Sequence, residues 1–66
     1  MCMMTVAYDE ELGGRIIMEN VVALSVNDKG ICLAGLLDDP IMLDDVRVAR
    51  IDFRRGRTYL VRKAGQ

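Results

Sequence analysis

We expect the fold to follow from residues 21–37, which read VVALSVNDKGICLAGLL. Two apolar runs, residues 21–26 and 31–37, flank the polar tetrapeptide Asn27-Asp28-Lys29-Gly30. Apolar, β-branched runs of this length favour strands, and asparagine, aspartate and glycine favour tight turns. The second run is apolar on both faces, which predicts burial on both sides: one face carries Ile31, Leu33 and Leu37 and the other Cys32, Ala34 and Leu36.

The rest of the chain has the same pattern of short strands and turns. We expect strands at 2–8, 46–53 and 57–62, a short edge strand at 41–43, and an apolar bridge at 15–18. Glycine-containing turns at 9–14 and 54–56 and the break at Asp38-Asp39-Pro40 separate them. No helix is expected. The sequence therefore predicts an all-β fold, a small SH3-like barrel of five to seven short antiparallel strands that forms a single domain over residues 1–66.

Composition limits what such a domain can do. A 66-residue chain that is 52% hydrophobic buries only about 60% of its unfolded surface, so we expect it to form a homodimer. Residues 1–43 carry a net charge of −5 and residues 44–66 a net charge of +4, which we interpret as solvated faces. We expect a cytoplasmic protein, because the sequence has neither a run of about 20 apolar residues nor a signal sequence.

The available side chains argue against an enzyme. The chain has no histidine, so the Ser-His-Asp and Cys-His arrangements cannot be built from it. The acidic pairs lack calcium-loop spacing and are interpreted as turn residues: Glu10-Glu11, Asp38-Asp39 and Asp44-Asp45. Cys32 lies within an apolar strand, where a cysteine packs as a small hydrophobe. Cys2, directly behind the initiator methionine, is the remaining chemically specific residue.

Four segments of the chain carry a resemblance to a known family: Met1-Cys2-Met3, Gly13-Gly14-Arg15, Val46 to Asp52, and Arg55-Gly56. Together they resemble the CooT family, small nickel-binding proteins that accompany the maturation of carbon monoxide dehydrogenase. The resemblance implies a homodimeric all-β protein that binds Ni(II) through Cys2. It also implies that the partners are a nickel enzyme or its maturation factors.

The chemistry of Cys2 is compatible with that role. Once Met1 is removed, Cys2 offers both an α-amine and a thiolate, and thiolates suit soft or borderline ions. Two such pairs, one from each protomer, provide nitrogen and sulfur donors that suit Ni(II) in a planar field. A monomer offers too few strong ligands. We therefore expect a metallochaperone or nickel buffer with Cys2 at the dimer interface.

Two other functions stay open. The first is an RNA-binding small β-barrel, in which Tyr59 or Phe53 stacks on bases and arginines contact phosphates: Arg47, Arg50, Arg54, Arg55, Arg57 and Arg62. The single phenylalanine and the absence of tryptophan leave few stacking platforms, so nucleic acid ranks below nickel. The second is a non-catalytic interaction domain whose dimer face binds another protein.

Overall fold

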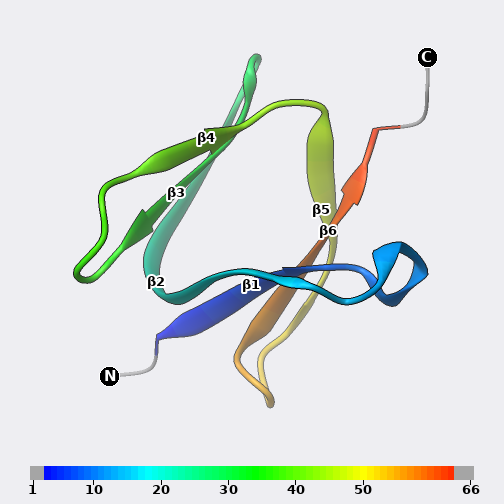
Figure 1. The fold of residues 1–66 in the computed structure, drawn as a ribbon, viewed down its shortest axis with the longest axis horizontal. Helices are drawn as coiled ribbons and strands as arrows, with labels where there is room; N and C mark the ends of the chain where they lie inside the picture. The colour runs from blue at the N-terminus through cyan, green and yellow to red at the C-terminus, as the bar shows by residue number, and fades with distance from the viewer. Residues whose placement is uncertain (1–2, 64–66) are drawn as a thin grey trace.

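The computed structural model describes residues 3–63. Within them the chain forms six strands and one 3-10 turn (Figure 1), in the order β1 (Met4–Tyr8), η1 (Glu10–Leu12), β2 (Ile16–Asn27), β3 (Gly30–Gly35), β4 (Ile41–Leu43), β5 (Val46–Asp52) and β6 (Arg57–Arg62). The all-β prediction is confirmed. The short turn η1 occupies the glycine-closed segment that was expected at 9–14, and Gly13 follows it with a φ of 94°.

The six strands make one sheet in the order β4-β3-β2-β1-β6-β5. The predicted SH3-like closure is not confirmed, because no pairing joins the edge strands β4 and β5 in the part of the chain that the structure describes. The sheet is instead curled, so that β3 and β5 come into contact without pairing. The expectation of purely antiparallel strands is also wrong, since β1 pairs with β6 in parallel from Thr5 to Tyr8.

The parallel pair follows from the long path between its members. β6 lies 49 or more residues along the chain from β1, so no tight turn forces these two strands to run in opposite directions. Two backbone bonds outside the ladder hold the ends of the pair. The amide of Thr5 donates to the carbonyl of Gly56 at 2.9 Å, and the amide of Asp9 donates to the carbonyl of Leu60 at 2.8 Å.

The strand β2 joins two segments that the sequence pattern separates. Its first part pairs with β1 and its second part with β3, and Val21 pairs with both Met4 and Gly35. At the junction Asn20 has a φ of 58°, a left-handed conformation that asparagine tolerates better than most residues. The carbonyl of Asn20 accepts a bond of 3.0 Å from the amide of Leu36. This local bend lets one strand serve both halves of the curled sheet.

The core fills the inside of the curl. Its members come from five of the six strands, with Leu33, Leu60 and Val6 fully buried, followed by Ile31, Val21, Val46 and Met18. Burying a side chain of this size contributes roughly 1.5–3 kcal/mol.

The prediction that residues 31–37 are buried on both faces is only half correct. Ile31 and Leu33 are buried, whereas Cys32 and Ala34 are half-buried. The strand ends at Gly35, and the chain then bends ahead of Pro40. Leu37 is consequently 90% exposed.

Candidate functional site

Cys2 lies outside the described residues, and the description begins with the strand that follows it. Met3 is described and 40% exposed, and β1 begins at Met4. The strand β1 has a neighbour on each side, β2 and β6. The described chain that follows the candidate ligand thus enters the middle of the sheet.

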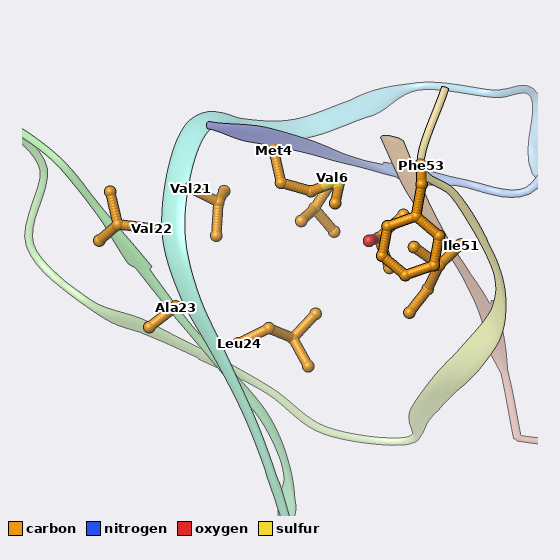
Figure 2. Close-up of a pocket in the computed structure, with 9 residues that line it drawn as sticks. Met4, Val6, Val21, Val22, Ala23, Leu24, Ile51 and Phe53 are labelled. Atoms are coloured by element: carbon orange, nitrogen blue, oxygen red, sulfur yellow. The ribbon is translucent and has the colours of Figure 1, made fainter. Parts of the chain in front are cut away.

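An apolar groove adjoins the start of β1 (Figure 2). It has a volume of about 360 Å³, and nine residues line it: Met4, Val6, Val21, Val22, Ala23, Leu24, Ile51, Phe53 and Thr58. Ile51 and Phe53, from the end of β5 and the turn after it, face Val21 and Leu24 of β2 across the opening. The groove arises because β2 bends away from the β5–β6 hairpin and leaves the apolar side of each uncovered.

Several apolar side chains at this groove remain in contact with solvent. Phe53 is 82% exposed, Val22 51% and Ile51 45%. Exposed apolar side chains that gather around one opening are typical of an interaction surface. Sequence reasoning did not find the groove, because its lining comes from four separate segments, and no local pattern shows that they meet.

The other candidate ligands do not converge. Among residues 3–63, no three cysteine, aspartate or glutamate side chains lie close enough to hold a metal ion. The three acidic pairs lie in turns or loops or in η1, as predicted. Cys32 is a half-buried residue of β3 with a free thiol. In the sheet its backbone lies opposite Ser25 of β2 and Met42 of β4. It is therefore less buried than expected.

The arginines gather on the β5–β6 hairpin. Residues 46–63 contain seven positive side chains and one negative side chain, a net charge of +6. A polar hollow of about 370 Å³, here called the arginine hollow, is lined by Glu10, Arg50, Asp52, Arg54 and Arg55. The guanidinium carbon of Arg50 lies 4.1 Å from the centre of the Tyr59 ring, within the range of a cation–π contact.

Most of the aromatic rings that could stack on RNA bases already lie against arginine side chains. Tyr59 is only 4% exposed and has Arg50 over its ring. Tyr8 has Arg15 at 5.9 Å and Arg62 at 5.8 Å from its ring centre. Phe53 is the ring that stays open to solvent in the described part of the chain. RNA binding nevertheless stays a prediction.

Among residues 3–63, no helix is long and apolar enough to cross a bilayer.

A curled six-stranded sheet with an apolar groove and an arginine hollow defines a small all-β protein with surfaces suited to binding other molecules. The chain belongs to the CooT family: the model of the family described as CO dehydrogenase accessory protein CooT matches residues 1–61. The resemblance seen in the sequence is thereby confirmed. A search of curated proteins found no match.

Proposed function

We propose that this protein takes up Ni(II) as cargo through Cys2 and passes it to carbon monoxide dehydrogenase or to a factor that matures it. The observation that carries the proposal is the family match over residues 1–61, which includes Cys2. An accessory protein of a nickel enzyme needs a ligand that binds nickel and also releases it. Cys2 offers a thiolate, the kind of ligand that suits a soft or borderline ion.

The fold supports this role by anchoring the segment that carries Cys2. Met4 pairs with Val21 of β2, pairing with β6 begins at Thr5, and the amide of Thr5 is bonded to the carbonyl of Gly56. A ligand held this close to a fixed strand loses less conformational freedom on binding than one on a long flexible tail. The sheet thus gives the residues that follow Cys2 a rigid support.

Two copies of the chain are needed to complete the ligand set. The described residues of one chain supply no cluster of three ligands, and Cys2 alone supplies at most a thiolate and an amine. We propose that the apolar groove contacts a second copy, because it adjoins Met4 and leaves Phe53, Val22 and Ile51 exposed. The proposed contact is symmetric, so that each protomer contributes one Cys2 to the shared site. The product is a homodimer with one nickel site.

Nickel titration of the untagged protein tests the proposal. The thiolate-to-metal absorption in the near ultraviolet should saturate at one nickel per dimer, and Cys2→Ser should abolish it. Cys32→Ser is the matched control, since the same substitution on β3 should leave the stoichiometry unchanged. Normal nickel binding by Cys2→Ser would exclude the proposal.

A third form of the protein, with two extra residues ahead of Cys2, tests whether the α-amine of Cys2 is a nickel ligand. Acylation turns the basic amine into a peptide nitrogen, so the extended form should bind nickel more weakly while its circular dichroism stays the same. Equal affinity of the extended and untagged forms would exclude the amine and leave the two thiolates as the main donors.

A further inference from the structure

The arginine hollow and the apolar groove lie on opposite faces of the β5–β6 hairpin. Ile51 pairs with Thr58 and both line the groove, whereas the preceding pair, Arg50 and Tyr59, points the other way. Successive residues of a strand face opposite sides of a sheet. A second copy seated on the groove therefore leaves the hollow free for a different partner.

Two of the three arginines of the hollow, Arg50 and Arg54, have no carboxylate partner among the described residues. Arg50 rests on the Tyr59 ring at 4.1 Å. Asp52 accepts bonds from the backbone amides of Arg54 and Arg55 at 3.1 Å and 3.0 Å, which fixes the turn that carries their side chains. Within residues 3–63, the one ion pair is that of Arg55 with Asp52, at 3.9 Å. The guanidinium groups of Arg50 and Arg54 thus keep their donors for an external acceptor.

An acidic peptide fits this arrangement better than a single-stranded nucleic acid does, because the ring beside the guanidinium groups is covered. A guanidinium presents paired N–H donors that match a carboxylate in a bidentate geometry. Glu10 and Asp52 also line the hollow, and their negative charges weaken the attraction for phosphates and carboxylates alike. The nearby Tyr59 ring is covered by Arg50 and offers no surface on which a base could stack.

We propose that the arginine hollow is a docking site for an acidic segment of a partner protein, with glutamate or aspartate side chains bound by Arg50 and Arg54. The surplus positive charge of the hairpin, +6 over residues 46–63, steers such a segment toward the site. Docking here is independent of nickel, because no proposed nickel ligand lines the hollow.

Fluorescence anisotropy with a fluorescein-labelled oligoglutamate peptide measures this binding on the full-length protein. Affinity should fall steeply between about 50 and about 200 mM salt, and Arg50→Ala should weaken it about tenfold. Arg50→Lys should lose most of the affinity as well, because lysine keeps the charge but lacks the planar fork. Arg54→Ala should weaken peptide binding as well. Because Arg54 is an exposed turn residue, this second measurement does not depend on the contact between Arg50 and Tyr59.

Two further variants separate a specific site from bulk charge. Lys29→Ala removes one positive charge at the β2–β3 turn, outside the hollow, and should leave the affinity within about twofold. Glu10→Gln removes an opposing charge inside the hollow and should strengthen binding about threefold.

Three results would overturn the proposal. One is the absence of peptide binding at low salt, and another is an equal loss in Lys29→Ala and Arg50→Ala. The third is arginine-dependent binding of an oligouridine in place of the peptide, which would assign the hollow to RNA.

Discussion

Gly30 sets how closely the β2–β3 turn approaches the end of β4. It has a φ of 149°, and a Cβ on it would overlap the carbonyl oxygen of Leu43 and lie 3.0 Å from the carbonyl carbon. Both obstacles are backbone atoms, which cannot rotate away. We therefore predict that Gly30→Ala lowers the free energy of unfolding by about 3 kcal/mol, measured by urea denaturation.

Gly13→Ala is the control for this prediction. Gly13 also has a positive φ, 94°, but a Cβ there would meet nothing within 4 Å. Its substitution should cost only the conformational penalty, about 1 kcal/mol. Equal losses at both positions would show that backbone conformation alone, and not the approach of Leu43, determines the effect at Gly30.

Individual side chains were predictable where a local pattern determines them. The turn role of Asn27 is confirmed, since its side-chain oxygen accepts bonds from the amides of Lys29 and Gly30 at 2.8 Å and 3.1 Å. Leu37 was assigned wrongly to a buried face, because the alternation says nothing of where a strand ends. The role of Cys2 came from the family resemblance and stays a prediction, since Cys2 lies outside the described residues.

The β5–β6 hairpin depends on one side chain at its turn. One carboxylate oxygen of Asp52 accepts bonds from the amides of Arg54 and Arg55, and Asp52 pairs with Arg57 where the strands meet. Asp52→Ala removes this acceptor, so we predict a loss of about 1–2 kcal/mol in unfolding free energy. Thermal or urea denaturation gives the value.

Asp52→Asn separates the hydrogen bonds from the charge. Asparagine keeps a carbonyl oxygen that can accept from the same two amides, whereas the ion pair with Arg55 at 3.9 Å is lost. Because exposed ion pairs contribute little, the asparagine variant should keep most of the stability. A loss as large as that of Asp52→Ala would indicate that the charge matters more than the turn geometry.

The strands were predictable to the extent that their signals are local. The expected strands at 41–43 and 57–62 match β4 and β6, and the strand expected at 46–53 is one residue longer than β5. The continuity of β2 was missed, because Glu19 and Asn20 interrupt the apolar pattern while the backbone continues through a bend.

The arrangement of strands could not be read from the sequence. The parallel pairing of β1 with β6 joins the two ends of the described chain, and no short-range signal specifies it. The open curl and the apolar groove follow from that pairing together with the bend at Asn20. The family resemblance suggested a small β protein with a dimer interface but did not locate the groove.

Dimerisation through the apolar groove can be separated from the fold by one exposed residue. Phe53 is 82% exposed and lines the groove, so Phe53→Glu should leave the monomer folded. A carboxylate in an apolar contact carries a desolvation cost without a partner. We therefore predict that light scattering gives a dimer for the native protein and a monomer for Phe53→Glu, with weaker nickel binding in the variant because the second Cys2 is lost.

Leu37→Glu is the matched control. Leu37 is 90% exposed on the loop after β3 and does not line the groove, so the same introduced charge should leave both the dimer and its nickel affinity unchanged. If both Phe53→Glu and Leu37→Glu were dimers, the dimer interface would have to lie outside the groove. The assignment of Cys2 as the ligand would not be affected. A monomeric native protein, with and without nickel, would instead contradict the shared site itself, since one Cys2 would then have to bind the metal without its symmetry mate.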